Sequence, residues 1–165
     1  MKVLLFIALF ILEGLPNNPV EKVDLKRYAG KWYSLYSIPT LFDKGSRETT
    51  TYYTWNRKGY FDVLTKYKKP DSETVHSTNS KVFQVAGTNN AEMKAQFIWP
   101  YKVDYWVVEL AEDYSYVVVG HPQKKFLFIM SRQKTLDKKL LQDITKRCKE
   151  KGYEVNKLVS QQHND

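Results

Sequence analysis

The feature that most constrains the fold is an alternation of apolar and polar side chains that recurs in short segments from residue 32 to residue 131. Successive side chains on a strand point to opposite faces, so this alternation indicates strands with one buried face. The linkers, such as Arg57-Lys58-Gly59 and Pro70-Asp71-Ser72, are short turn sequences. We expect eight strands, at Trp32–Ile38, Glu48–Asn56, Tyr60–Lys68, Val75–Val85, Glu92–Ile98, Tyr105–Leu110, Tyr114–Gly120 and Phe126–Ser131.

Short strands that follow one another through tight turns predict an antiparallel up-and-down sheet. Eight such strands can close into a barrel, which removes unpaired edges and leaves an interior that side chains fill or that holds one small ligand. The 165 residues suit a single domain. We therefore expect an all-β fold, an eight-stranded antiparallel up-and-down β-barrel.

The periodicity changes after residue 131. Thr135 is a suitable N-cap, and Gly152 a suitable C-terminal stop, for one α-helix packed on the outside of the barrel. Its apolar face is predicted at Leu136, Leu140, Leu141, Ile144 and Cys148, which recur at helical spacing.

The N-terminus begins with Lys2 and an unbroken apolar run from Val3 to Leu12, followed by Pro16. This pattern is typical of a secretory signal, the alternative being an N-terminal core strand or helix. We expect a signal peptide at residues 1–16 and one domain at residues 17–165. The protein would then be exported, to a periplasm or as a secreted protein. Because no cysteine lies near the predicted cut, we expect no lipid anchor.

The net charge of +8 favours anionic partners, among which nucleic acid, membrane surfaces and acidic lipids stay open. The one cysteine, Cys148, excludes an internal disulfide and a cysteine-cluster zinc site. Three scattered histidines offer little for a metal centre. We expect neither a metal nor a cofactor.

Three groups of residues, in order along the chain, resemble the three sequence motifs of the lipocalin family, in particular its bacterial and apolipoprotein D-like branch. The similarity covers residues 24 to about 159, and its motif positions are Asp24, Tyr28, Gly30, Trp32, Tyr33, Asp104, Tyr105, Trp106, Asp113, Tyr114, Ser131 and Arg132. The resemblance implies that Trp32 closes one end of the barrel and that Arg132 packs across its ring as a cation–π contact. The alternative is that Arg132 is a ligand-binding charge.

The same resemblance places pocket residues at Tyr28, Tyr53, Thr65 and Phe128. Alternation along the strands adds inward-facing side chains, among them Ser34 and Ile38 on the side of Trp32, and Thr51, Trp55, Val63 and Phe126. The predicted ligand-binding set is Tyr28, Tyr36, Tyr53, Phe61, Thr65, Tyr67, Met93, Ala95, Phe97, Phe128 and Met130. These side chains suit a long apolar ligand with one polar end, or they simply fill the barrel.

Basic side chains near strand ends form either a solvated face or a rim that attracts an anionic headgroup; they are Lys44, Arg47, Lys66, Lys68 and Lys69. We expect binding, transport or storage of a fatty acid or lysophospholipid, in the service of envelope lipid maintenance. A sterol, a pigment or haem is the alternative ligand. A membrane surface is a further candidate partner, and the chain is expected to be a monomer or a weak homodimer.

Two other classes of function are weighed against this one. A lipocalin-like enzyme would need a nucleophile, yet Cys148 lies on the predicted helix, and no G-x-S-x-G, H-E-x-x-H or P-loop motif is present. A nucleic-acid-binding barrel would have five strands, and the aromatic residues fall largely on the predicted inner face. We therefore expect no catalytic activity and no nucleic acid partner.

Overall fold

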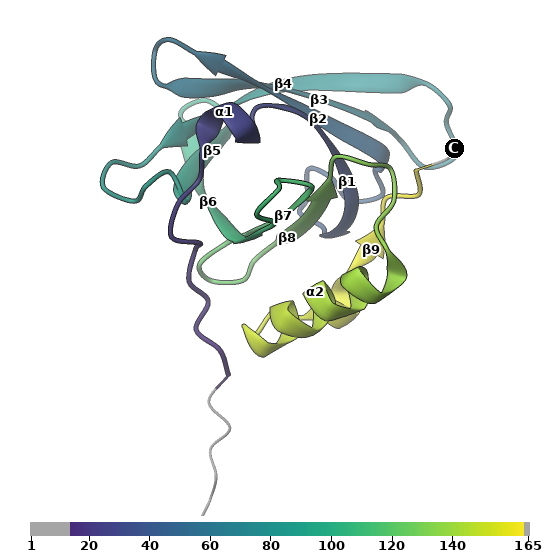
Figure 1. Cartoon of the computed structure of the whole chain (residues 1–165). Helices are drawn as coiled ribbons and strands as arrows, with labels where there is room; N and C mark the ends of the chain where they lie inside the picture. The colour runs from purple at the N-terminus through teal and green to yellow at the C-terminus, as the bar shows by residue number, and fades with distance from the viewer. Residues whose placement is uncertain (1–13, 164–165) are drawn as a thin grey trace, which may run out of the picture.

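The eight strands expected from the alternation form a closed antiparallel barrel in the computed structural model, which describes residues 14–163 (Figure 1). Neighbouring strands pair in chain order, and β1 pairs with both β8 and β2, which closes the barrel. The predicted fold is confirmed. The strands are β1 Gly30–Ile38, β2 Arg47–Asn56, β3 Tyr60–Lys68, β4 Val75–Gln84, β5 Glu92–Ile98, β6 Tyr101–Leu110, β7 Tyr116–Gly120 and β8 Leu127–Ser131, with a short ninth strand, β9 Val159–Ser160.

A bulge at Leu35 changes which face the second half of β1 presents. The register against β8 shifts between Ser34, which faces Met130, and Tyr36, which faces Ile129. One extra residue in a strand moves all later side chains to the other face. Tyr36 therefore packs outside the barrel with Ile129, and Ile38 also packs there, so their predicted positions inside the barrel are wrong.

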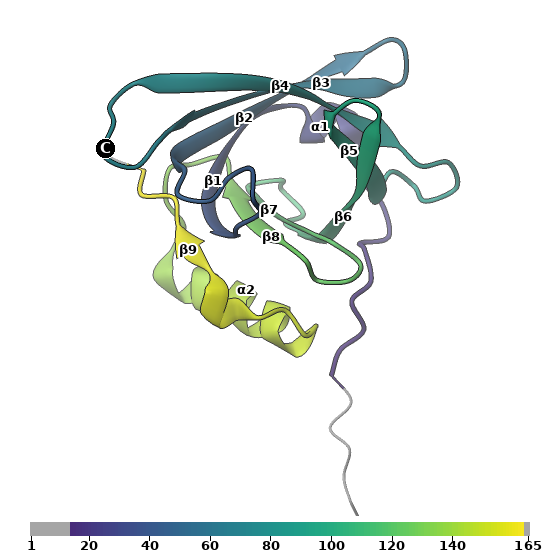
Figure 2. The same ribbon diagram turned by 180° about the vertical axis from the view of Figure 1, so that it is seen from behind.

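The helix α2, Lys138–Glu150, packs on the outer face of the barrel (Figure 2). Ile144 and Cys148 are its buried residues, as its apolar periodicity predicts. The predicted N-cap at Thr135 is wrong, because the Asp137 carboxylate accepts the Leu140 backbone N–H at 2.9 Å and the helix begins after it. The helix ends before Gly152, whose φ of +87° lies in the left-handed region that glycine adopts freely.

A short helix, α1 Leu25–Tyr28, leads into β1 at one end of the barrel, where Arg132 lies over Trp32. The guanidinium carbon is 3.6 Å from the centre of the Trp32 ring. Its nitrogens donate to the backbone carbonyls of Lys31 at 2.7 Å and Arg27 at 2.6 Å. These contacts join α1, β1 and the end of β8, so we refer to this as the closed end.

The C-terminal segment closes a gap in the barrel wall beyond the bulge. β1 and β2 pair only over Gly30–Tyr33. Farther along, the Gln161 backbone N–H donates to the Leu35 carbonyl at 2.9 Å, and its carbonyl accepts the Glu48 N–H at 2.5 Å. Gln161 follows the 3₁₀ turn η1 Val155–Lys157 and β9, which pairs with the outer half of β1. The segment after α2 is thus part of the barrel seam.

No helix within residues 14–163 combines the length and the hydropathy that a membrane crossing requires. Most of the expected signal peptide at 1–16, namely residues 1–13, lies outside the described residues.

Candidate functional site

The half of the barrel next to the closed end is packed solid. Three tyrosine hydroxyls meet there: Tyr105 lies 2.6 Å from Tyr28 and 2.7 Å from Tyr53. Burial raises the pKa of Tyr28 and of Tyr105 well above the usual value, and raises that of Tyr53 to about 12. The neutral hydroxyls satisfy one another, and with Trp32 and Phe61 they form an aromatic floor.

An apolar cavity of about 110 Å³ lies above this floor. A site that holds one water needs roughly 10–15 Å³, so this volume is more than a packing defect. Six residues of the predicted ligand-binding set line it: Tyr53, Thr65, Ala95, Phe97, Phe128 and Met130. Thr51, Val63, Val82 and Tyr105 complete most of the apolar wall.

A second apolar cavity, of about 170 Å³, continues toward the open end of the barrel. Thr65, Phe97 and Phe128 line both cavities, so the two adjoin. Tyr67, from the predicted set, lines the outer one. Phe42, on the loop between β1 and β2, stacks on Phe97 with ring centres 6.0 Å apart and covers part of the entrance.

Three further residues of the predicted set, Tyr28, Phe61 and Met93, lie inside the barrel but do not line either cavity. They are fully buried in the packed half. Alternation assigns a side chain to a face of the sheet, whereas its height along the barrel axis decides whether it meets the floor or the cavity. Tyr36 lies outside the barrel, for the reason given above.

A polar chamber of about 280 Å³ opens beside the apolar cavities, between the β1–β2 loop, the β3–β4 loop and the C-terminal segment. Most of its lining residues have polar side chains, and these residues include Ser37, Ser46, Asp71, Ser160, Gln161 and Gln162. Gln161 lines the inner apolar cavity as well. Its amide oxygen accepts from Thr49 at 2.7 Å, and its amide nitrogen donates to Ser37 at 3.1 Å.

Asp43 lines all three cavities. Its Oδ1 accepts the Thr40 backbone N–H at 2.6 Å and the Thr40 hydroxyl at 2.5 Å. Its Oδ2 is buried and has no hydrogen-bond partner among residues 14–163. The alternation of the strands does not reach this loop, so the sequence analysis missed Asp43. The available signal was Thr40-x-x-Asp43, a spacing at which the acidic side chain reaches back to the backbone N–H of the first residue.

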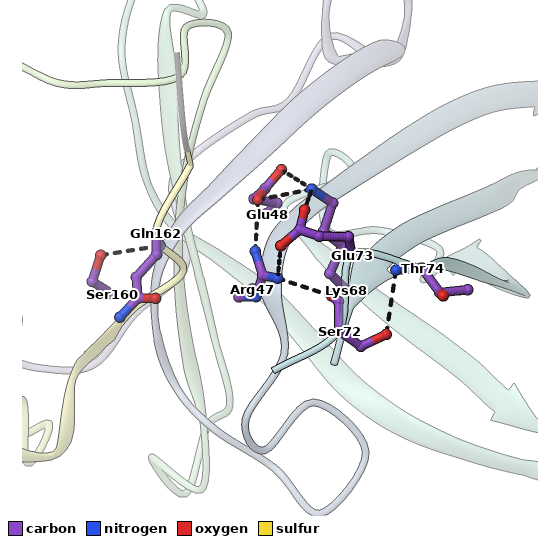
Figure 3. Close-up of polar contacts among 8 residues, drawn as sticks. All are labelled: Arg47, Glu48, Lys68, Ser72, Glu73, Thr74, Ser160 and Gln162. Carbon is purple, nitrogen blue, oxygen red and sulfur yellow. Dashed lines mark hydrogen bonds and ion pairs between the residues drawn. The ribbon is translucent and has the colours of Figure 1, made fainter. Parts of the chain in front are cut away.

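Two of the predicted rim cations are already paired. Arg47 binds Glu48 at 2.8 Å and also Glu73, while Lys68 binds Glu73 at 2.6 Å and Glu48 at 3.1 Å (Figure 3). Arg47 donates further to the Ser72 carbonyl at 2.8 Å. The Lys68 and Arg47 partners hold the pKa of Glu73 below its usual range. This network fastens β2 to β3 and the β3–β4 loop.

The remaining predicted cations, Lys44, Lys66 and Lys69, are exposed. Lys66 lies on the outer face of β3, where it lines a shallow hollow with Lys31 and Tyr52. It does not face the apolar cavities.

Cys148 lies in the packed interface between α2 and the barrel, where burial raises its pKa to about 12. The thiol is therefore protonated near neutral pH. Among residues 14–163, no group of three or more His, Cys, Asp and Glu side chains is arranged to hold a metal ion.

A closed eight-stranded barrel with an apolar interior at one end is an architecture that encloses one small ligand. Residues 23–163 match the family model described as a lipocalin-like domain, and the chain belongs to this family. The resemblance seen in the three motifs is confirmed. Lipocalins bind and carry small hydrophobic ligands.

The similar proteins include members of the bacterial and apolipoprotein D-like branch, which the sequence motifs also resemble. The chain is 29% identical over 149 residues to the outer membrane lipoprotein Blc of Vibrio cholerae, covering 88% of this chain and 87% of that protein. It is 34% identical over 114 residues to apolipoprotein D of Rattus norvegicus, covering 67% and 58%. Insecticyanin from Manduca sexta shares the fold, with a TM-score of 0.72 at 19% identity over 92% of this chain and 87% of that one.

The names of the bacterial relatives contradict one expectation. The Blc proteins of Vibrio cholerae and Citrobacter freundii are named outer membrane lipoproteins, so the prediction of an exported protein without a lipid anchor is wrong. That prediction relied on the absence of a cysteine near residue 16, and residues 1–13 are outside the described part of the chain.

Proposed function

We propose that this lipocalin binds a fatty acid or a lysophospholipid, with the acyl tail in the two adjoining apolar cavities and the polar end at the barrel mouth, and that it transports or stores this lipid for envelope maintenance. The observation that carries the proposal is the apolar chamber between the aromatic floor and the open end. A sterol, a pigment or haem is the alternative ligand.

Burial of the acyl tail supplies most of the binding free energy. Burying a twelve-carbon tail at ~0.8 kcal/mol per methylene gives about 10 kcal/mol before the costs of association. Losses of translational, rotational and conformational freedom take several kcal/mol of this. A dissociation constant near the micromolar range, about 8 kcal/mol, needs only a modest further contribution at the head.

The source of the lipid in this proposal is a membrane surface. Large apolar side chains are exposed around the mouth: Leu41 by 94%, Trp99 by 82% and Tyr101 by 75%. Lys44 lies on the same loop as Leu41, and Lys102 follows Tyr101. Exposed apolar side chains beside basic ones suit the interface of an anionic bilayer.

The proposal includes no catalytic step and no nucleic acid partner, and the protein acts as a monomer or a weak homodimer. Support for the first point comes from Cys148, whose protonated thiol is buried outside the cavity. Support for the second comes from the many aromatic side chains that form the floor and line the inner cavity, where they are not available to stack on nucleobases.

Native mass spectrometry of the protein purified from its own host tests the proposal. We expect a single-chain lipid to accompany the wild-type protein. Phe128→Arg, which places a charge in both apolar cavities, should lose that lipid and remain folded. Tyr52→Arg, which introduces the same side chain on the outer face of β2, should retain it. Equal retention by both variants would exclude the cavity as the binding site.

A further inference from the structure

The wall of the barrel between β1 and β2 has a gap that one residue fills. The ladder between these strands ends before the bulge, and Gln161 bridges them beyond it. Its backbone bonds the Leu35 carbonyl on one side and the Glu48 N–H on the other. Its side chain bonds Thr49 at 2.7 Å and Ser37 at 3.1 Å, and the residue is only 3% exposed. This part of the wall therefore depends on one residue of the C-terminal segment rather than on a ladder of paired strands.

Gln161 also separates two cavities of different character. It lines the inner apolar cavity, together with Ser34 and Thr49, and it lines the polar chamber, together with Ser160 and Gln162. The polar chamber opens to solvent between the loops that surround it. If Gln161 moved out of the gap, the inner cavity and the polar chamber would join. The inner cavity would then have a side opening between β1 and β2.

The seam segment, residues 159–163, is held to the barrel by few contacts, two of which adjoin strained backbone. It contacts β1 through the two residue pairs of β9, through Gln161, and through the His163 ring, which bonds the Ser34 carbonyl at 2.8 Å. Glu48, which donates to Gln161, has a φ of +51°, and Gln162, which follows it, has a φ of +48°. Residues with a side chain adopt this left-handed region at a cost, and surrounding contacts must hold them there. Detachment would relax this strain, which lowers the free energy needed to open the seam.

We propose that the seam segment swings off β1 as a gate, and that the lipid tail enters and leaves the inner cavity through the opening between β1 and β2. This inference rests on the proposed function and adds the route by which the ligand exchanges. The hydroxyls of Ser37 and Thr49, which lose Gln161 when the gate opens, can be hydrated from the polar chamber, so opening leaves no buried group unsatisfied. At the mouth, by contrast, the stacked rings of Phe42 and Phe97 cover part of the entrance.

Stopped-flow fluorescence with a dansyl-labelled undecanoic acid measures the association and dissociation rate constants. Gln161→Ala removes the side-chain bonds to Thr49 and Ser37 and keeps the backbone bonds, so it weakens the closed state of the gate. We expect both rate constants to rise about tenfold while the dissociation constant changes by less than about threefold. A residue that only contacts the lipid would instead change the dissociation constant, mainly through the dissociation rate. Gln162→Ala, the same change on the exposed side chain next to it, is the matched control and should leave both rate constants within about twofold.

A reversible lock tests the motion itself and does not depend on the stability of Gln161→Ala. Tyr36 on β1 and Ser160 on β9 are antiparallel partners, a spacing that a disulfide can bridge. The native Cys148 is buried and protonated near neutral pH, so it does not compete for the bond. In the double variant Tyr36→Cys, Ser160→Cys, oxidation should slow both rate constants at least about tenfold, and reduction should restore them.

The mouth is the alternative route, and the same measurements distinguish it from the gate. If the lipid uses the gate, Phe42→Ala should change both rate constants by less than about threefold. If Phe42→Ala accelerates exchange, while Gln161→Ala and oxidation of the lock leave the rates unchanged, the lipid passes through the mouth and the gate is excluded. If the wild-type protein does not bind the dansyl probe at all, the proposed lipid site fails and the gate fails with it.

Discussion

Replacing Arg132 by Met should strongly destabilise the closed end while leaving the lipid cavity intact. The guanidinium lies 3.6 Å over the Trp32 ring and donates to the carbonyls of Lys31, Arg27 and Ala29 at 2.7, 2.6 and 3.0 Å. Met keeps much of the aliphatic packing and removes both the charge and these donors. The alternative role for Arg132 is to bind the ligand through its charge. The substitution distinguishes this role from the structural one, because a structural residue affects stability and a ligand-binding residue affects lipid affinity.

The magnitude follows from these contacts. Hydrogen bonds that involve a charged group contribute ~1.5–3 kcal/mol each, and a cation–π contact contributes ~0.5–2 kcal/mol. Arg132 is half-buried, so water replaces part of the lost donors. We expect Arg132→Met to lower the free energy of unfolding by about 3 kcal/mol. Arg132→Lys keeps the charge without the planar fork and should cost about 2 kcal/mol.

Urea unfolding followed by circular dichroism gives these values, with Arg57→Met in the exposed β2–β3 turn as the control. The control should change the free energy of unfolding by less than about 0.5 kcal/mol. The lipid affinity of folded Arg132→Met should match that of the wild type. Stability close to the wild type together with a large loss of lipid affinity would refute the structural role and favour the ligand-binding one.

Three further predictions concern the floor, the outer helix and the mouth. Tyr105→Phe removes the hydroxyl that contacts both Tyr28 and Tyr53, and should lower the free energy of unfolding by about 1–3 kcal/mol. An unchanged urea midpoint would contradict a stabilising role of these hydrogen bonds in the aromatic floor. Because burial raises the pKa of Cys148 to about 12, iodoacetamide at pH 8 should label this thiol only in the unfolded protein, and rapid labelling of the native protein would show that α2 does not pack as described. Trp99→Ser should reduce co-sedimentation with anionic vesicles while leaving the affinity for a single-chain lipid unchanged. Undiminished co-sedimentation would exclude the mouth as the membrane contact.

The faces of most strands could be predicted from the sequence because alternation reports them directly. Thr65 and Tyr67 on β3, and Ala95 and Phe97 on β5, line the cavities on the predicted side. The prediction failed for Tyr36 because a bulge adds one residue without changing the apolar pattern that precedes it.

The depth of a side chain and the contributions of the loops could not be predicted in the same way. Phe61 and Thr65 share a face of β3, yet Phe61 belongs to the floor and Thr65 to the cavity wall. Asp43 and Gln161 reach the cavity from a loop and from the C-terminal segment, where no periodicity applies. Their positions depend on contacts with residues distant in the sequence, such as the bond from Gln161 to Leu35.

The most direct test of the account is to locate the end of the acyl tail by nuclear magnetic resonance. A single-chain lipid labelled with ¹³C at its terminal methyl is bound to the protein, and intermolecular nuclear Overhauser effects from that methyl are recorded. We expect contacts with Val63, Ala95 and Met130, which line the inner cavity. Contacts confined to exposed side chains at the mouth, such as Leu41 and Trp99, would contradict a lipid tail inside the barrel.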